Sequence, residues 1–483
     1  MNWQQLSHAS REEIEAIQNK KLRQFVAHVL PFSPFYRALF EKRGLSFNDI
    51  QTTDDLVKLP FISKEDIAPT VEDRARPRQF ILQPDEHLIK QYARKSTLIK
   101  LLLGKLTGQN VKAKLEWEFR PVHVHFTTGR SALPTTFVNT NYDLELLKES
   151  GRRLLDVIRV PNDVTAINGF PYSPHLAFWL GYYAPVAVNM TSLATGGGKI
   201  MGTQKILDAL ERTKAALAMF IPGYCYHILR QAVADGRDLS SLKTLVFGGE
   251  RVSDGLRQRV QELTTKLGAT DVKILATYAM TECKTAWIQC SEHTGYHLYP
   301  DLGYVELVNK EGKRAKDGEP GEVVYSTLDW RGSVVMRYRT GDLAKGIEWG
   351  SCPGCGKTVP RIFPDIQRKS EVKEFNLAKL KGVLVNLNNV YPLLSARRDI
   401  EEWQLEIRKR NDDPYEVDEL RLHVAPKSGV KLAAIRDELD RAIRDELEVS
   451  VDLIETPLPK LLEQLGMETE LKEKRIVDLR PKT

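Results

Sequence analysis

Cysteine is scarce in this sequence, because its 483 residues include only five cysteines, an odd number. A secreted scaffold held together by disulfides needs more cysteines, in even number, so the sequence excludes that class. We therefore expect a reducing, cytoplasmic environment. In such an environment, clustered cysteines serve as metal ligands rather than as disulfide partners.

Long apolar runs are also missing. No run approaches the roughly 20 residues of a membrane-spanning helix. The opening MNWQQLSHASREEIE is polar and acidic where a signal peptide would be apolar. We expect no transmembrane segment. A net charge of +6 is small for this length; it does not indicate a nucleic-acid partner and suits a protein that binds anionic small molecules such as ATP or coenzyme A.

Acidic residues are absent from residues 90–114, where seven Lys or Arg surround the apolar stretch LIKLLLGKL. Such a basic amphipathic element suits contact with a membrane surface, an acidic carrier protein or coenzyme phosphates. A solvated helix whose lysine stems cover apolar surface explains the same pattern without any partner and is the more common arrangement.

Strand-like and helix-like segments alternate over residues 164–276, which predicts a doubly wound α/β arrangement with parallel strands. Residues 11–44 have helical periodicity and predict a helical cap at the N-terminus. After Glu282 the pattern alternates by twos between Gly and Asp turns, which predicts an antiparallel β subdomain. The last hundred residues predict a compact α+β unit. The fold class is therefore α/β.

Polar residues capable of binding a nucleotide follow three of the expected strands. The segment KILATYAMTE (273–282) ends in an aromatic ring and a carboxylate, which suit a base and Mg²⁺. The segment LVFGGE ends in Gly248, Gly249 and Glu250, where a flat group can lie against bare backbone. The hydroxyl-rich turn Thr127-Thr128-Gly129 predicts a phosphate loop, although TTG is also an ordinary turn.

Four segments in this order, TTG, GGE, YAMTE and YRTGDLA, together with the N-terminal SPFYRALFEKRGLSFNDI, resemble the adenylate-forming superfamily, and in particular the phenylacetate–CoA ligase family. The resemblance covers nearly the whole chain. It implies ATP-dependent activation of a small-molecule carboxylic acid to an acyl-adenylate, then transfer to coenzyme A with release of AMP. Both reactants of the first step are anions, so the site must neutralise charge and hold an in-line geometry.

The resemblance also implies a role for each matching residue. Tyr278 stacks on adenine, with Gly248, Gly249 and Glu250 along the other face of the base. Thr281 bonds the α-phosphate and Glu282 holds Mg²⁺. Asp342 takes both ribose hydroxyls, as a carboxylate with two oxygens can do.

The phosphate loop departs from the family pattern, because Phe126 replaces the first glycine and the usual lysine is missing. Arg130 can supply the lost positive charge in bidentate form. Thr127, Thr128, Gly129 and Arg130 then form either a working altered loop or an impaired one.

The family's C-terminal domain is a small mobile α+β lid that carries a catalytic lysine. The ending LKEKRIVDLRPKT aligns that lysine with Lys472, with Lys474 as the fallback. Arg368 occupies the place of the arginine at the hinge. We therefore expect an adenylate-forming domain over residues 1–368 and a lid domain over residues 369–483.

A zinc site is expected near the β subdomain. Cys352 and Cys355 have the C-x₂-C spacing of half a tetrahedral site. Cys290 can supply a third ligand, and His297 or His293 the fourth. Because relatives of the phenylacetate–CoA ligase type carry a similar set, the resemblance favours His297. Such a closed site would be structural, whereas reduced cysteines without a ligand remain the alternative.

The acyl pocket is expected from the resemblance to include Phe170, Tyr172, His175, Tyr224 and Ala279. An aromatic lining favours an aryl acid, although such residues are more often simply core. One alternative function passes the acyl group to an amine or to the thiol of an acyl carrier protein, and another is a nucleotide- or acyl-binding homologue with impaired catalysis. Homodimer formation is left open.

Overall fold

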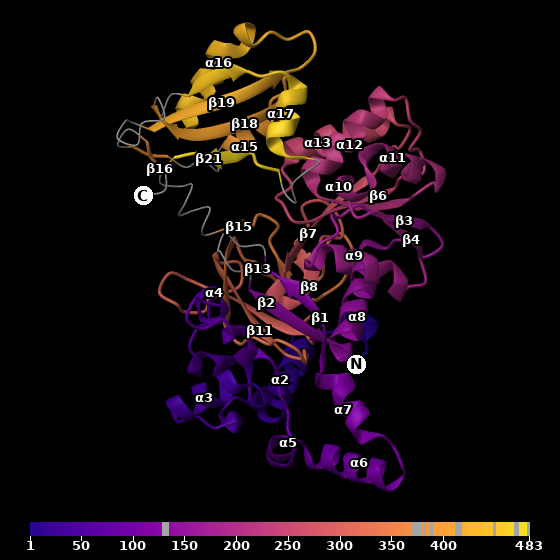
Figure 1. Ribbon diagram of the computed structural model, residues 1–483, viewed down its shortest axis with the longest axis vertical. Helices are drawn as coiled ribbons and strands as arrows, with labels where there is room; N and C mark the ends of the chain where they lie inside the picture. The colour runs from indigo at the N-terminus through magenta and orange to yellow at the C-terminus, as the bar shows by residue number, and fades with distance from the viewer. Residues whose placement is uncertain are drawn as a thin grey trace. The chain divides into compact units, whose positions relative to one another are not determined.

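The computed structural model describes residues 1–127, 135–368, 378–380, 383–385, 390–410, 418–447, 451–467 and 473–480 (Figure 1). The chain divides into two compact units. Unit 1 consists of Met1–Asp163, Tyr172–Ser192 and Thr277–Ile366, and unit 2 of Val164–Pro171, Leu193–Ala276 and Gln367–Thr483. The last segment of unit 2 starts two residues before the predicted domain boundary; the division into domains at residue 368 stays a prediction.

Unit 1 begins with short helices. They are α1 (Trp3–Leu6), α2 (Arg11–His28), α3 (Pro34–Arg43), α4 (Lys64–Ile67), α5 (Glu86–Tyr92), α6 (Lys95–Leu106) and α7 (Val111–Phe119), followed after two strands by α8 (Asn141–Ile158) and α9 (Leu176–Ala187). Local sequence sets several of their ends. Ser10 and Glu13 form a capping box at the start of α2, and Gly44 ends α3 in the left-handed conformation.

The strands of unit 1 are mostly antiparallel. They are β1 (Pro121–Phe126), β2 (Thr136–Thr140), β8 (Thr285–Ile288), β9 (Tyr296–His297), β10 (Gly303–Val308), β11 (Gly321–Thr327), β12 (Tyr338–Ala344), β13 (Ile347–Glu348) and β14 (Arg361–Ile362). β11 pairs antiparallel with both β10 and β12. The buried hydroxyl of Tyr36 on α3 accepts a hydrogen bond from Met336 N at 2.7 Å, which ties the helical cap to this sheet. The predicted β subdomain is confirmed, and helices occupy residues 11–44, where the sequence predicted a helical cap.

Unit 2 is built on a parallel sheet. Its elements up to residue 276 are β3 (Thr165–Asn168), the second half of β4 (Thr191–Ala194), α10 (Gly198–Met201), α11 (Thr203–Arg212), β5 (Leu217–Phe220), α12 (Pro222–Ala234), β6 (Thr244–Phe247), α13 (Asp254–Lys266) and the first part of β7 (Lys273–Met280). β3, β5, β6 and β7 are neighbours in that order and run parallel. All residues of β5 and β6 are buried, as expected of strands covered on both faces. The predicted α/β class is confirmed.

β7 is the strand that carries the chain from unit 2 into unit 1. After Ala276 it pairs antiparallel with β8, from Thr277 opposite Ile288 to Met280 opposite Thr285. The residues after Ala276, which include Tyr278, Thr281 and Glu282, therefore belong to unit 1.

The C-terminal part of unit 2 has an α+β fold. Its described elements are β15 (Gln367–Arg368), β16 (Ala378–Leu380), β17 (Val383–Val385), α15 (Val390–Ser395), β18 (Ile400–Lys409), β19 (Asp418–Pro426), α16 (Leu432–Leu447), β20 (Asp452–Glu455), α17 (Leu458–Leu465) and β21 (Ile476–Asp478). Four of these strands form a sheet in the order β20-β19-β18-β21. Its core includes Trp403, Leu405 and Leu439, which confirms the predicted α+β character of the C-terminal region.

Candidate active site

Tyr278 and Asp342 meet in unit 1, although 64 residues separate them in the sequence. The Tyr278 hydroxyl donates a hydrogen bond to Asp342 Oδ2 at 2.8 Å. Burial, and then the negative charge of Asp342, raise the pKa of Tyr278 well above its ordinary value, so this hydroxyl stays protonated and acts as a donor. The aromatic ring and the carboxylate predicted to hold adenine and ribose thus occupy one site.

The ring of Tyr278 rests against two further aromatic side chains. Its centroid lies 5.7 Å from that of Trp287 and 6.0 Å from that of Tyr296, both in tilted arrangements. Because Trp287 on β8 is buried, it supports the Tyr278 ring from the protein side. Tyr278 itself is half-buried. A supported, partly accessible ring is a suitable platform for a nucleobase.

Asp342 is held in place by the local geometry of β12. Gly341 has a φ of +76°, which only glycine adopts readily, and it sits just before Asp342 in the YRTGD segment. The backbone N–H of Asp342 donates to Thr340 Oγ1 at 3.0 Å. Asp342, Thr340 and Tyr338 all lie on the buried face of β12. The glycine therefore shapes the strand where the carboxylate is presented.

Glu282 is oriented by a second residue of β12. Thr281 and Glu282 lie in the 3-10 turn Thr281–Cys283 that follows β7. The hydroxyl of Tyr338 donates to Glu282 Oε1 at 2.7 Å. Mg²⁺ prefers oxygen ligands such as carboxylates, and a hydrogen bond from a phenol fixes the orientation of such a ligand. Glu282 therefore fits the predicted ion. Tyr338 was not among the predicted site residues.

Lys284 anchors this turn through a buried ion pair, although it was not among the predicted site residues. Its Nζ lies 2.8 Å from Asp143 Oδ2, and both side chains are almost fully buried. Asp143 also caps the start of α8 and accepts hydrogen bonds from the backbone N–H groups of Arg331 (2.6 Å) and Gly332 (2.8 Å). Burial lowers the pKa of Lys284, and Asp143 opposes that shift. The ion pair joins α8 and the segment before β12 to the turn that carries Glu282.

The predicted phosphate loop is only partly described. Thr127 follows β1, and its backbone N–H donates to Thr135 O at 3.0 Å. Thr128, Gly129 and Arg130 lie outside the described residues. The preceding Phe126 donates its N–H to Pro174 O at 2.8 Å, and His175 Nδ1 lies 2.8 Å from Phe126 O. The strand that leads into the loop is therefore fastened to the segment that carries His175.

Two more predicted pocket residues of unit 1 are accessible to solvent. Tyr172 is 60% exposed, and Ala279 on β7 is exposed as well. Tyr172 makes an edge-to-face contact with Phe178, at a centroid distance of 5.1 Å, and Phe178 makes another with Trp179, at 5.5 Å. These rings form an aromatic cluster on the segment of unit 1 that also holds His175.

The remaining predicted residues belong to unit 2. Gly248 and Gly249 follow β6, and a Cβ added to Gly249 would meet no atom within 4 Å. Glu250 Oε1 accepts a hydrogen bond from Glu473 N at 3.1 Å. Phe170 and Tyr224 are buried, and the Tyr224 hydroxyl lies 3.2 Å from Thr203 Oγ1. Their predicted contacts with adenine and with the acyl group stay predictions.

The predicted hinge arginine and the predicted lid lysine have little or no described structure. Lys472 lies outside the described residues, whereas its fallback Lys474 lies within them. The backbone of Arg368 belongs to β15. The roles of Lys472 and Arg368 stay predictions.

Three cysteines and one histidine converge in unit 1. One potential ligand atom from each of Cys290, His297, Cys352 and Cys355 lies within 4.8 Å of every other, and all four residues are buried. Cys290 Sγ is 3.5 Å from Cys352 Sγ, and Cys355 Sγ is 3.2 Å from His297 Nε2. Ligand atoms around a tetrahedral Zn²⁺ lie roughly 3.5–4 Å apart, given Zn–S and Zn–N lengths of about 2.3 and 2.0 Å. The four side chains therefore fit such an ion.

Three further features suit metal binding at this cluster. His297 Nδ1 lies 3.1 Å from Ile288 O, which favours a proton on Nδ1 and leaves the Nε2 lone pair facing the thiols. A Cβ added to Gly354 would come within 2.7 Å of Cys290 Sγ, so the turn between Cys352 and Cys355 needs glycine there. Hydrogen bonds from Cys290 first and then Cys355 lower the pKa of Cys352, which favours the thiolate form that binds metal.

The sequence and fold place this site in a known family. Residues 152–337 match the family described as AMP-binding enzyme. This region is an AMP-binding domain of the adenylate-forming superfamily. It is 24% identical over 423 residues to phenylacetate-coenzyme A ligase of Escherichia coli, covering 83% of this chain and 81% of that protein. It is 23% identical over 487 residues to the enzyme of that name from Thermus thermophilus, covering 97% of each.

Solved structures support the fold of this adenylate-forming enzyme. A structure of 2-hydroxyisobutyryl-CoA ligase in the postadenylation state, in complex with R3-HIB-AMP, aligns with a TM-score of 0.75 and 19% identity, covering 98% of this chain and 91% of that one. The same ligase in the thioesterification state aligns with a TM-score of 0.63. At this identity the likeness concerns the fold alone. The predicted superfamily, fold class and enzymatic nature of the chain are confirmed.

Proposed function

We propose that this enzyme activates a carboxylic acid with ATP and transfers the acyl group to coenzyme A. In the first step a carboxylate oxygen bonds to the α-phosphorus of ATP while the bond to the leaving pyrophosphate breaks. In the second, the coenzyme A thiol loses its proton, its sulfur bonds to the acyl carbon, and AMP leaves. The observation that carries the proposal is the pairing of Tyr278 with Asp342 in unit 1, and the names of the relatives support it.

The adenosine part of ATP would be bound by Tyr278 and Asp342. The ring, backed by Trp287, offers one face to adenine. A carboxylate has about four lone-pair positions on its two oxygens, so Asp342 can accept from Tyr278 and from ribose hydroxyls together. Because the pKa of Tyr278 is raised, its hydroxyl remains the donor and Asp342 remains an acceptor for the ribose.

The phosphates would be bound from the turn after β7. Thr281 is proposed to bond the α-phosphate, and Glu282 would hold Mg²⁺, which when bound neutralises phosphate charge. Tyr338 and the Lys284–Asp143 pair orient and anchor this turn, so the donor positions are set before the substrate arrives. Thr127, Thr128, Gly129 and Arg130 are proposed as the phosphate loop, and Lys472 as the lysine contributed by the lid.

Zn²⁺ would be held by Cys290, His297, Cys352 and Cys355. Three thiolates and an imidazole close a tetrahedral shell and leave no position for substrate, so the ion would stabilise structure only. Ordering this cluster supports the ring of Tyr296, which immediately precedes His297 and packs on Tyr278.

An aryl acid is the proposed substrate class. The rings of Tyr172, Phe178 and Trp179 form an aromatic cluster in unit 1, and flat acids gain from edge-to-face and stacked contacts with such rings. In unit 2, Phe170 and Tyr224 are proposed to contribute further aromatic surface.

The test is carboxylate-dependent exchange of labelled pyrophosphate into ATP, measured with benzoate, phenylacetate, hydroxybenzoates and short aliphatic acids, followed by product analysis with and without coenzyme A. We expect exchange with aryl acids and a thioester with coenzyme A. Exchange with only aliphatic acids would overturn the aryl assignment. Exchange without any coenzyme A thioester would indicate that the acyl acceptor is an amine or the thiol of a carrier protein instead of coenzyme A. ATP binding without exchange for any acid would identify an impaired homologue.

A further inference from the structure

Helix α6 exposes an apolar stripe that no part of the described chain covers. Ile99, Leu102, Leu103 and Leu106 are 56%, 63%, 55% and 83% exposed. At about 100° per residue, these positions span roughly 100° of the helix circumference, so they form one continuous face. Gly104 is the one buried residue of this twelve-residue helix. A folded protein rarely leaves a row of four large aliphatic side chains in water without a partner.

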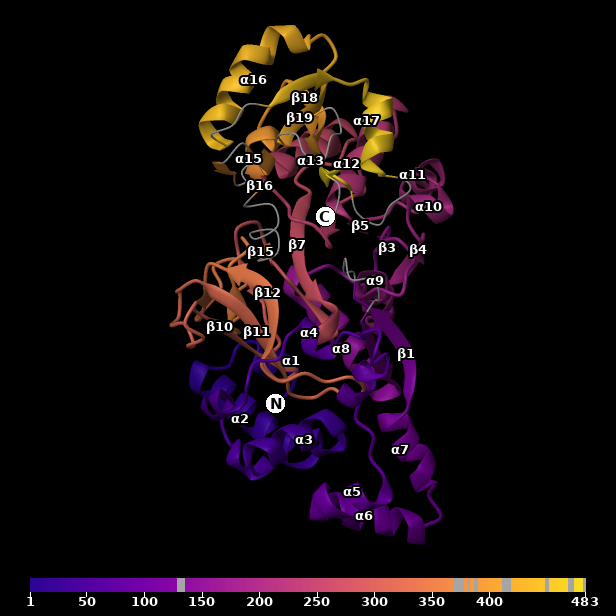
Figure 2. The ribbon, with the colours of Figure 1, turned by 60° about the vertical axis from the view of Figure 1, so that its left-hand side comes forward.

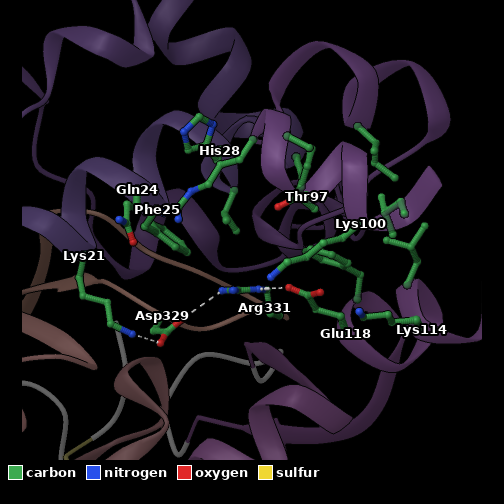
Figure 3. Close-up of a pocket in the computed structure, with 18 of the residues that line it drawn as sticks. Lys21, Gln24, Phe25, His28, Thr97, Lys100, Lys114, Glu118, Asp329 and Arg331 are labelled. Atoms are coloured by element: carbon green, nitrogen blue, oxygen red, sulfur yellow. Dashed lines mark hydrogen bonds and ion pairs between the residues drawn. The ribbon is translucent and has the colours of Figure 1, made fainter. Parts of the chain in front are cut away.

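The other side of α6 borders a cavity, although Thr97 and Lys100 on that side are exposed and Leu101 is half-buried. Thr97, Lys100 and Leu101 line a cavity of about 380 Å³ between α2 and the α5–α7 segment. Figure 3 shows Lys100 reaching into this cavity toward Arg331, whose guanidinium is held by Glu118 and Asp329. Figures 1 and 2 both show α6 at one end of unit 1, away from β11. The exposed stripe therefore lies at that end of unit 1.

Positive charge surrounds the stripe. Lys95 lies one helical turn before Ile99 in the same row, and Lys105 lies about 60° around the helix from Leu102. Lys112 at the start of α7 adds a third exposed cation. Among the described residues, none of these three lysines lies within 4.0 Å of a carboxylate oxygen, and residues 90–114 contain no acidic side chain. Lys105 is near Glu86 of α5, whose pKa is lowered mainly by Lys90 and to a smaller extent by Lys105. The surface is both apolar and cationic.

We propose that α6 docks this enzyme on the surface of an anionic lipid bilayer. The aliphatic stripe would enter the boundary between head groups and acyl chains, while Lys95, Lys105 and Lys112 would contact lipid phosphates. A helix with a charged polar face and one apolar face lies in the plane of the membrane. None of the described helices is both long and apolar enough to span a bilayer, so contact by α6 would be peripheral.

Charge favours lipid over a second copy of the chain. A two-fold contact through this stripe would place Lys95 and Lys105 of both copies in one interface, and juxtaposed like charges oppose such pairing. An anionic bilayer instead supplies negative charge across its whole surface and accepts a convex helix without a matching groove.

The experiment is flotation of the full-length protein with vesicles of phosphatidylcholine alone or with one third phosphatidylglycerol. We expect binding to the anionic vesicles that weakens as salt increases. The double variant Leu102→Ser/Leu106→Ser should lose at least about 100-fold in partitioning. Lys95→Gln/Lys105→Gln should lose about 30-fold, at about fivefold per lysine.

The matched control is Val57→Ser/Val71→Ser, which removes two exposed aliphatic side chains elsewhere in unit 1 and should float like the wild type. Thermal unfolding should be the same for all variants, because the substituted side chains are exposed. No flotation with anionic vesicles, or equal flotation of the stripe variant, would overturn the proposal. The proposal would also be overturned if the protein did not bind vesicles but formed a dimer, or a complex with an acidic carrier protein, that depended on Leu102 and Leu106.

Discussion

Replacing Lys284 by methionine should destabilise this enzyme more than any surface substitution of lysine. Methionine keeps the length and apolar stem of the side chain but removes the charge that faces Asp143 at 2.8 Å. Asp143 is fully buried and Lys284 is 1% exposed, so water cannot replace the lost partner. The carboxylate would remain charged in an apolar setting.

The magnitude follows from what remains around Asp143. Removing one partner of a buried ion pair costs about 3–5 kcal/mol. Backbone N–H groups of Thr140, Arg331 and Gly332 still donate to the Asp143 carboxylate, at 3.1, 2.6 and 2.8 Å. We therefore expect a loss near the lower limit, about 3 kcal/mol. Lys148→Met is the control, since Lys148 pairs with Glu145 at a surface where such pairs contribute about 0–1 kcal/mol.

The assay is urea unfolding followed by tryptophan fluorescence, with pyrophosphate exchange measured on the folded variants. Lys284→Met should lower the unfolding midpoint by up to about 1 M, whereas Lys148→Met should leave it nearly unchanged. The double variant Lys284→Met/Asp143→Asn should recover part of the loss, because both charges are gone. Equal stability of Lys284→Met and Lys148→Met would refute the reasoning.

Three further predictions concern the metal cluster and acid sensitivity. Cys352→Ser should abolish zinc in the purified protein and lower its stability, since structural zinc contributes on the order of 10 kcal/mol of binding; negligible zinc in the wild type as well would contradict this. Gly354→Ala should weaken zinc retention against a chelator, because its Cβ would lie 2.7 Å from Cys290 Sγ; unchanged retention would contradict it. Burial, and then the nearby His123, lower the pKa of His125 to about 3 from 6.5, so the unfolded chain binds a proton that the folded chain excludes, and stability is lost as pH falls from 6.5 toward 3. His125→Gln should therefore unfold less steeply over that range, and parallel acid-unfolding curves would contradict the prediction.

The strand ends that carry the nucleotide ligands were predictable because their chemistry is local. An apolar strand followed by Tyr278 and Glu282 is visible in ten residues of sequence, and the resemblance supplied the distant Asp342. The structure adds the hydrogen bond that joins Tyr278 to Asp342. For the metal cluster, C-x₂-C spacing identified Cys352 and Cys355, whereas spacing alone left His293 and His297 open. The structure groups His297 with the cysteines.

Other parts of the site were not predictable, because they depend on contacts between distant segments. Nothing in the sequence marks Lys284 as the partner of Asp143, which lies 141 residues earlier. From the sequence, Tyr338 is an ordinary strand residue; only the structure shows that its hydroxyl donates a hydrogen bond to Glu282, 56 residues away. The pattern of residues 90–114 predicted either a basic amphipathic element that binds a partner or a solvated helix, but only the fold shows that Ile99, Leu102, Leu103 and Leu106 are exposed.

The most direct test of the central claim is ATP-dependent pyrophosphate exchange with an aryl acid, comparing Asp342→Asn with the wild type. Asparagine keeps the shape of Asp342 but loses the charge that accepts from Tyr278 and from ribose. A hydrogen bond to a charged group contributes about 1.5–3 kcal/mol, so we expect the dependence on ATP to weaken by about 10- to 150-fold. Asp163→Asn, at an exposed position of unit 1, should behave as the wild type. Unchanged ATP dependence in Asp342→Asn would contradict the account.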